Sequence, residues 1–191
     1  MTVTATLRDG SEIGLRPIQP DDKQVLLEGF ERLSPESRYK RFLVPMNELS
    51  ERDLRYLTEV DHHDHEAIVA QTPQGEPLGV ARFVRTNGDT AEAAVAVTDD
   101  WQGKGVGTAL LTRLAERARE EGISHFTATC LATNDDMLQL LRELGPTRIL
   151  NTGSGVVEAQ IDLPASTAKE DPLRHLLRRA AEGLLDIRLP G

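Results

Sequence analysis

Three alternating glycines in the middle of the chain have the character of an anion-binding loop. Gly103, Gly105 and Gly107 lie between a strand-like segment and an apolar-periodic segment that predicts a helix. Without side chains, backbone N–H groups can approach an anion closely, and the first N–H groups of a helix have no intrahelical acceptor. The positive end of the helix dipole adds to this attraction, so the segment predicts a site for a phosphate or pyrophosphate. A simple flexible turn is the weaker interpretation, because three glycines cost more conformational entropy than a turn requires.

Two familiar phosphate-binding loops do not fit the glycine spacing. A dinucleotide-binding fingerprint that starts at Gly103 requires glycine at Thr108, and one that starts at Gly105 requires glycine or alanine at Leu110. A nucleoside triphosphate loop requires glycine and lysine followed by serine or threonine, whereas Lys104 is followed by Gly105. The spacing therefore excludes both loops.

Glu92 is the candidate for acid–base chemistry. It interrupts the apolar strand-like segment 91–97, which precedes the glycines. Strand alternation places it on one face with Ala94 and Ala96, and burial on that face would raise the carboxyl pKa to a value suited to a general base. The alternative is an exposed residue at the end of a strand, beside the turn 87–89.

Two other groups of reactive residues favour structural interpretations. The run 61–66 is rich in histidine and carboxylate, but neighbouring residues of one segment rarely converge on one ion. We therefore expect no metal there. We expect a solvated loop, which would line the cleft where a substrate binds. Cys130, the single cysteine, lies in an expected interior strand and is interpreted as a packed thiol rather than a nucleophile.

Turn signals and apolar periodicity predict a mixed α+β domain that would position these residues. Asp9 and Gly10 separate the two strands of an opening hairpin, and Gly122 closes the helix that begins at Val106. The expected strands are 4–7, 12–16, 67–71, 78–85, 91–97, 125–131, 148–150 and 156–163, and the expected helices are 20–32, 35–42, 50–57, the one from Val106, and 134–144. The glycines would thus open a helix that packs on the sheet through one apolar face.

Composition and the ends of the chain set further limits. The net charge is -9 and the pI is near 5.1, so we expect no wholesale binding to nucleic acid or to an anionic membrane. The N-terminus lacks a secretory signal pattern and no apolar run is long enough to span a bilayer, which predicts a cytoplasmic protein. We divide the chain into a domain at 1–163 and, at 164–191, a linker with a C-terminal amphipathic helix. The apolar face of that helix would pack on its own domain or on a second copy, as in a homodimer.

The glycine segment and its surroundings resemble a known enzyme family. Gln102, two residues, Gly105, one residue and Gly107, preceded by a strand and the acidic turn 98–101, are similar to the signature of the GCN5-related N-acetyltransferase (GNAT) family. That signature is glutamine or arginine, two residues, glycine, one residue, then glycine or alanine. The resemblance covers roughly residues 5–163. It implies a central, mostly antiparallel twisted sheet of about seven strands flanked by helices, and acetyl-CoA or another acyl-CoA as co-substrate.

The resemblance also implies roles for single residues. Glu92 would take the proton of an attacking amine, directly or through water, and the amide of Val97 would polarise the acyl carbonyl. The residues that would hold CoA are Val95, Val97, Gln102, Gly103, Lys104, Gly105, Val106, Gly107, Thr108 and Asn134. Asn134 also fits the N-cap of the next helix. Many family members have a tyrosine at the position of Leu141 as general acid, and this departure leaves the acid unassigned.

The resemblance implies a primary amine as acceptor. The segment 30–42, with 15–18 upstream, resembles the bacterial protein-lysine acetyltransferases that modify acyl-CoA synthetases, which implies a protein lysine. A small-molecule amine fits equally, and the basic residues 38–41 are interpreted as a charged helix end in preference to an acceptor-binding patch. From a different class, a noncatalytic acyl-CoA-binding sensor remains the alternative, since position 141 lacks the tyrosine.

Overall fold

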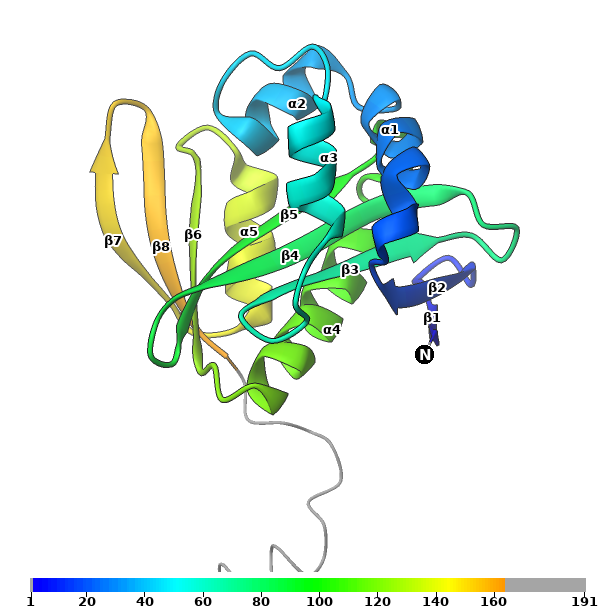
Figure 1. The fold of residues 1–191 in the computed structure, drawn as a ribbon. Helices are drawn as coiled ribbons and strands as arrows, with labels where there is room; N and C mark the ends of the chain where they lie inside the picture. The colour runs from blue at the N-terminus through cyan, green and yellow to red at the C-terminus, as the bar shows by residue number, and fades with distance from the viewer. Residues whose placement is uncertain (1, 164–191) are drawn as a thin grey trace, which may run out of the picture.

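One eight-stranded sheet runs through the molecule in a computed structural model of the chain, which describes residues 2–163 (Figure 1). The strands are β1 (Val3–Thr6), β2 (Glu12–Pro17), β3 (His65–Gln71), β4 (Pro77–Asn87), β5 (Thr90–Val97), β6 (His125–Leu131), β7 (Thr147–Gly153) and β8 (Val156–Asp162). They lie in the order β1-β2-β3-β4-β5-β6-β8-β7, and every neighbouring pair is antiparallel except β5 and β6. The expected mixed fold with a mostly antiparallel sheet is confirmed, with eight strands, as the turn signals predict, where the family resemblance implies about seven.

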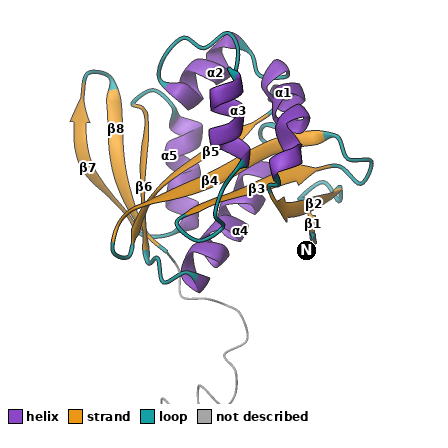
Figure 2. Ribbon diagram, in the orientation of Figure 1, coloured by secondary structure: helices purple, strands orange, loops and turns teal. Residues whose placement is uncertain are grey.

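Helices cover both faces of the sheet (Figure 2). The helices are α1 (Lys23–Glu31), α2 (Pro35–Phe42), α3 (Glu51–Thr58), α4 (Val106–Glu120) and α5 (Asp135–Leu144), with the short 3-10 turns η1 (Pro20–Asp22) and η2 (Asp99–Trp101). The first three helices lie on one face, and α4 and α5 lie on the other. No helix of the described residues has the length and apolar character that crossing a membrane requires. The linker and helix expected at 164–191 lie outside the described residues.

The residues of β3 show why both faces need covering. Ile68 and Ala70 belong to one apolar cluster with residues of α4, whereas Ala67 and Val69 belong to a second cluster with residues of α1 and α3. All four side chains are at most 1% exposed. Alternation along a strand sends successive side chains to opposite faces, so an uninterrupted apolar run requires helices on both sides.

Local signals start the two helices nearest to the candidate site. The hydroxyl of Ser34 accepts a hydrogen bond from the N–H of Ser37 at 3.1 Å, and Pro35 occupies the first turn of α2. The side-chain oxygen of Asn134 accepts from the N–H of Met137 at 3.2 Å and starts α5 in the same way. Both helix starts lie where the sequence analysis predicts them.

The strands β5 and β6 pair only at their beginnings. Their ladder has three residue pairs and ends at Glu92 and Thr127. Beyond this point β5 stays paired with β4 as far as Val97, while β6 stays paired with β8 as far as Leu131. The two strands therefore diverge and leave an opening within the sheet (Figure 1).

Gly79 is a point where β4 and β5 leave no room for a side chain. A Cβ at this position would lie 2.6 Å from the carbonyl oxygen of Ala96 and 3.1 Å from Leu110 Cδ1. We expect Gly79→Ala to lower the free energy of unfolding by about 1–3 kcal/mol, as overpacking does in other cores. The control is Gly29→Ala, whose Cβ would meet only Pro77 at 3.8 Å, and helix propensity favours alanine there by up to about 1 kcal/mol. Urea denaturation checks both variants, and equal unfolding midpoints would contradict the close approach.

Candidate functional site

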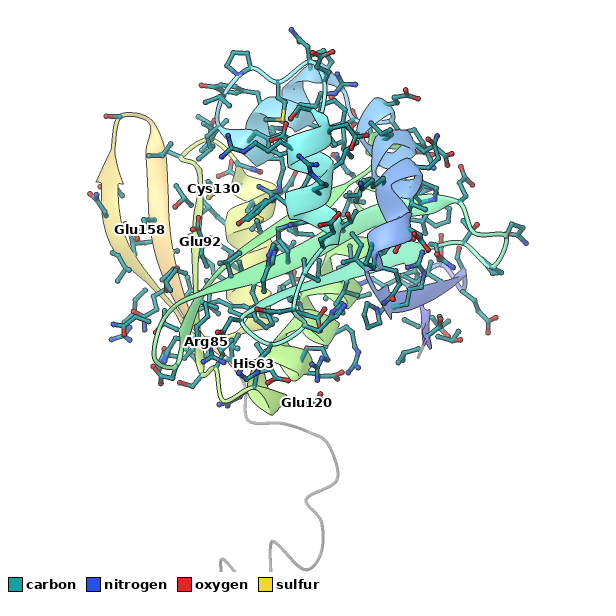
Figure 3. The ribbon with its side chains drawn as sticks, in the orientation of Figure 1. His63, Arg85, Glu92, Glu120, Cys130 and Glu158 are labelled. Atoms are coloured by element: carbon teal, nitrogen blue, oxygen red, sulfur yellow. The ribbon has the colours of Figure 1, made fainter. Side chains whose placement is uncertain are left out.

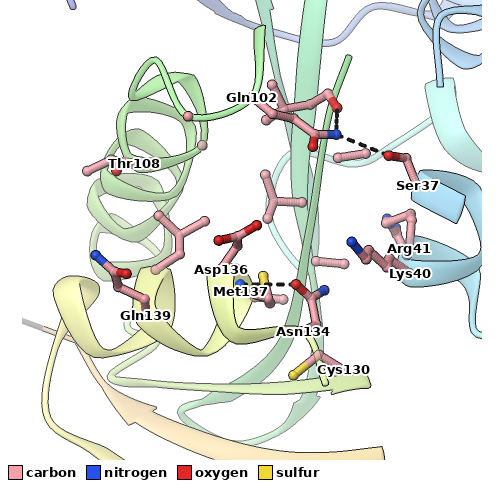
Figure 4. A pocket seen from close by; sticks show the side chains of 18 of the residues that line it. Ser37, Lys40, Arg41, Gln102, Thr108, Cys130, Asn134, Asp136, Met137 and Gln139 are labelled. Atoms are coloured by element: carbon pink, nitrogen blue, oxygen red, sulfur yellow. Dashed lines mark hydrogen bonds between the residues drawn. The ribbon is translucent and has the colours of Figure 1, made fainter. Parts of the chain in front are cut away.

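The opening between β5 and β6 is part of a cleft of about 500 Å³. Residues of β5, of the glycine loop, of α2 and of α5 line this cleft, and Figure 4 shows their side chains converging. Ser37, Lys40 and Arg41 come from α2, and Asp136 and Gln139 come from α5. The cleft thus follows the divergence of the two strands and reaches helices on both faces of the sheet.

The glycine loop borders this cleft at the start of α4. Gly103 and Gly105 have φ angles of 71° and 94°, which favour glycine, and a Cβ on Gly103 would meet no atom within 4 Å. Gly105 is the N-cap residue and provides no side chain to cap the helix. The N–H groups of the first turn of α4 are therefore without a capping side chain, as a phosphate site at a helix start requires.

The other loop residues differ in what they offer. A Cβ on Gly107 would lie 3.1 Å from Leu140 Cδ2, so this glycine allows α4 and α5 to pack closely. The side chain of Val106 is fully buried in the core, which leaves only its backbone for a ligand. Lys104 Nζ lies 4.6 Å from the centroid of the Trp101 ring, in cation–π geometry. Gly103 and Gly105 thus allow the backbone conformation of the open loop, and Gly107 allows close helix packing. Lys104 lies beside the loop, against the Trp101 ring.

The side chain of Gln102 connects the loop to β5 and to α2 through hydrogen bonds. Its side-chain Nε2 donates to the carbonyl oxygen of Val97 at 3.0 Å and to Ser37 Oγ at 3.1 Å. Figure 4 shows these bonds between the loop, the end of β5 and α2. We conclude that the glutamine side chain positions the loop.

The open edge of β5 carries the backbone groups of Val95 and Val97. The N–H of Thr98 donates to the carbonyl oxygen of Leu78, in β4, at 2.9 Å. Backbone groups of successive strand residues point to alternate edges. The N–H and C=O groups of Val97 and Val95 therefore point away from β4, toward the opening. Apart from the carbonyl oxygen of Val97, which accepts from Gln102, this edge has no partner among the described strands and can bind an extended ligand as it would bind a further strand.

Glu92 lies where the pairing of β5 with β6 ends. It shares a face with Ala94, as strand alternation predicts, and both residues line the cleft. The expected burial of Glu92 is wrong, because its side chain is exposed. Only the opposite face of β5, with Ala91 and Ala93, is buried in the core that includes α4, while the small side chain of Ala94 leaves space beside the carboxylate. The carboxylate is therefore accessible from the cleft.

Three residues of β6 and α5 occupy different environments. Asn134 lines the cleft and also caps α5, so its two interpretations are compatible. Leu141 is 1% exposed and belongs to the apolar core, where it cannot deliver a proton. Cys130 borders the cleft but is only 1% exposed, as expected of a packed thiol, and burial raises the pKa of this thiol.

The histidine and carboxylate run 61–66 lies away from the cleft. Figure 3 shows His63 near the end of α4, far from Glu92. The expected solvated loop is correct for the exposed residues of the run but wrong for Glu66, which is 1% exposed and accepts from Arg117 Nε at 3.1 Å. The run lines neither the cleft nor the cavity beside it. Within residues 2–163 no group of three or more histidine, cysteine, aspartate or glutamate side chains is placed to hold a metal.

Three basic residues at the site were missed or undervalued from the sequence. Lys40 and Arg41 line the cleft, so the interpretation of 38–41 as a charged helix end is incomplete. Arg82 was not singled out, although it is buried beside the cleft and lines a second cavity. The available signal was a charge within the apolar strand segment 78–84, the same signal that drew attention to Glu92.

Comparisons with known proteins agree with this geometry. The model of the acetyltransferase (GNAT) family matches residues 27–145. Acetyltransferase Pat of Mycolicibacterium smegmatis is 33% identical over 165 residues, which are 85% of this chain and 49% of that protein, so the chain spans about half the length of this relative. The L-methionine sulfoximine/L-methionine sulfone acetyltransferase of Pseudomonas aeruginosa is 38% identical over 87 residues, 41% of this chain and 48% of that protein. Among solved structures, the GNAT domain of S. lividans PAT has a TM-score of 0.80 and 34% identity, and the match covers 85% of this chain and 97% of that one.

The burial of Cys130 predicts slow modification of its thiol. Because burial raises the thiol pKa, less of the reactive thiolate is present at neutral pH than in the unfolded chain. We expect iodoacetamide to label the native protein more than about tenfold more slowly than the urea-unfolded protein, since both access and thiolate formation are reduced. The native rate should keep rising with pH above the range of an ordinary thiol. Mass spectrometry of timed samples measures both rates, and native labelling as fast as unfolded labelling would show that the thiol is not packed.

Proposed function

The chain belongs to the GNAT family of acetyltransferases, and on that premise we propose that it transfers an acetyl group from acetyl-CoA to a primary amine. One observation carries the proposal: a single cleft joins a helix start without a capping side chain, a strand edge without a strand partner and an accessible carboxylate. In that order they suit the pyrophosphate, the extended arm and the reacting thioester of acetyl-CoA.

The loop and the strand edge have the donors that acetyl-CoA requires. The proposed contacts are Val95, Val97, Gln102, Gly103, Lys104, Gly105, Val106, Gly107, Thr108 and Asn134. The space in front of Gly103 holds no side chain, so the pyrophosphate fits against the loop and the first turn of α4. The arm would then follow β5 from Val97 toward Glu92, a distance of about 16 Å along an extended strand.

Glu92 is proposed as the base of the reaction. A lysine amine with an ordinary pKa of about 10.4 is almost fully protonated at neutral pH and must lose a proton before it can attack. Glu92 takes this proton, directly or through one water. The amine nitrogen then attacks the thioester carbonyl carbon, the C–N bond forms, the C–S bond breaks, and the sulfur leaves with the electron pair as the CoA thiolate. The nitrogen, which is positively charged after the attack, releases its second proton to water. A backbone N–H of the open edge close to Glu92 would donate to the carbonyl oxygen as it gains negative charge, whereas the N–H of Val97, about 16 Å away along the strand, would contact the arm.

A protein lysine is the proposed acceptor. The resemblance of 30–42 to bacterial protein-lysine acetyltransferases supports this choice, and the net charge of -9 would attract a basic partner surface. A small-molecule amine is the second candidate, because the similar Pseudomonas aeruginosa enzyme is named for L-methionine sulfoximine and L-methionine sulfone.

Acetyl-CoA binding should depend on the open space at Gly105. Gly105→Glu places a bulky negative side chain at the helix start, where it repels a pyrophosphate. We expect the affinity for acetyl-CoA to fall by roughly a hundredfold or more, because each lost hydrogen bond to a charged group is worth about 1.5–3 kcal/mol. Calorimetric titration of the purified protein measures this change.

The matched control for this titration is Gly75→Glu. Gly75 also has a positive φ, 91°, and open space around its Cβ position, but it lies in the turn between β3 and β4 and does not line the cleft. The control should therefore carry similar backbone strain and bind acetyl-CoA as the wild type does. Equal losses in both variants would assign the effect to strain, and no binding by folded wild-type protein would overturn the acetyl-CoA proposal.

Glu92→Gln should stop transfer without weakening acetyl-CoA binding. The amide keeps the shape of the side chain but cannot take a proton, so we expect kcat to fall about 10²–10⁴-fold. Release of the CoA thiol with an amine acceptor measures kcat, and calorimetry measures binding. Glu12→Gln, at an exposed position of β2 outside the cleft, is the control and should turn over at the wild-type rate. Wild-type turnover by Glu92→Gln would exclude this base, whereas tight binding by the wild type with no transfer to any amine would favour a noncatalytic sensor.

A further inference from the structure

A second cavity, of about 300 Å³, adjoins the cleft beside α2 and α3. It shares Arg41, Phe42, Glu92 and Ala94 with the cleft, so the two spaces meet at the carboxylate proposed as the base. An acceptor that presents its amine to Glu92 from this side would place the rest of the molecule in the cavity. The side chains of the cavity should therefore indicate what the acceptor carries beside its amine.

Arg82 lines this cavity from β4. It is 6% exposed, its Nη2 donates to the carbonyl oxygen of Leu57 at 3.1 Å, and its Nη1 lies 3.1 Å from His65 Nε2. Its partner across the β4–β5 ladder is Ala94, which also lines the cavity. The guanidinium is thus held in place by the protein, beside a residue too small to cover it.

Arg41 lines the same cavity from the last turn of α2. Its guanidinium lies 5.1 Å from the centroid of the Phe42 ring and forms no hydrogen bond or ion pair with any residue that the structure describes. Arg82 likewise has no carboxylate of residues 2–163 within ion-pair distance. Two guanidinium groups therefore border one cavity without a paired anion from the described part of the chain.

The charges around the cavity leave this pair unbalanced. Burial lowers the pKa of Arg82, and the like charge of Arg41 lowers it further. Burial also lowers the pKa of Arg41, with the charge of Glu92 acting in the opposite direction. The remaining carboxylate, Asp53, is engaged elsewhere, because its Oδ2 accepts from the N–H of Ser50 at 2.9 Å and from its hydroxyl at 2.6 Å. An anion in the cavity would offset the cost of burying two cations together.

We infer that Arg41 and Arg82 bind a carboxylate that the acceptor carries close to its amine. Guanidinium groups match a carboxylate through paired N–H donors, and Glu92 would receive the positively charged amine. The cavity thus offers opposite charges to an acceptor that carries both groups. This inference rests on the proposed acetyl transfer. The carboxylate belongs either to the acceptor itself, as in a free amino acid, or to an acidic side chain beside the reactive lysine of a protein.

Matched acceptor pairs test the inference. One arm compares L-methionine with L-methioninamide, which lacks the carboxylate, and the other compares two lysine peptides that differ by glutamate or glutamine next to the lysine. We expect kcat/KM to favour the carboxylate member in at least one arm by roughly ten- to a hundredfold, the range for a hydrogen bond to a charged group. The arm that shows the preference identifies the source of the carboxylate.

Variants of Arg41 assign the preference to the cavity, because Arg82 is too well integrated in the fold for a clean substitution. Arg41→Gln should remove at least about tenfold of the preference, and Arg41→Lys should keep most of it. Arg55→Gln is the control, since Arg55 is an exposed arginine of α3 that does not line the cavity, and it should keep the full preference. No preference in either arm, or a preference unchanged in Arg41→Gln, would overturn the inference.

Failure of the proposed function gives a different result. If none of the four acceptors is acetylated, the same acceptors are titrated by calorimetry into the protein saturated with CoA. Tighter binding of a carboxylate member, lost in Arg41→Gln and kept in Arg55→Gln, would support the carboxylate site although transfer has failed. Equal or absent binding of both members in both arms would overturn it.

Discussion

The separation of β5 from β6 is the constraint on which the rest of the structure depends. These two strands form the one parallel pair among the described strands, and α4 makes the crossover between them. Each strand is paired along its other edge, β5 with β4 and β6 with β8, so the two strands separate while both stay in the sheet. The crossover places the start of α4 after the end of β5, beside the opening. An unpaired backbone edge and an uncapped helix start thus lie along one cleft, and both require polar partners.

The two faces of β5 have different roles, because they differ in the side chains that they carry and in what packs against them. Ala91 and Ala93 are buried in the core that includes α4, so that face holds the strand in place. The other face carries Glu92 and Ala94, and the small Ala94 leaves the carboxylate exposed and lets the buried Arg82 border the second cavity. Larger side chains on this face would fill the space between β5 and α2. The same strand can therefore anchor the core on one face and border two ligand spaces on the other.

A feature could be predicted from the sequence when the residues that determine it are close together in the chain. The start of α2, the cap of α5 and the glycine loop were predicted because their signals lie within a few neighbouring residues. Alternation also predicted that Glu92 and Ala94 share a face, but no local signal says what covers that face. Glu66 shows the same limit, since its burial depends on Arg117, which is 51 positions away. Distances between packed elements, rather than the elements themselves, were the part that the pattern could not predict.

A leucine at position 141 has no proton to give to the departing thiolate. This position lies in the core that includes α4 and α5, so its side chain has no route to the cleft. A thiol of ordinary pKa, about 8.5, leaves as a thiolate at modest cost near neutral pH, and attack by an amine does not depend on a dedicated acid as strongly as expulsion of an alkoxide would. As the proposed base, Glu92 is exposed in the cleft and would pass the proton that it accepts to water at each turnover. An open cleft and an accessible base are consistent with a transfer in which solvent carries the protons and the protein supplies position and charge.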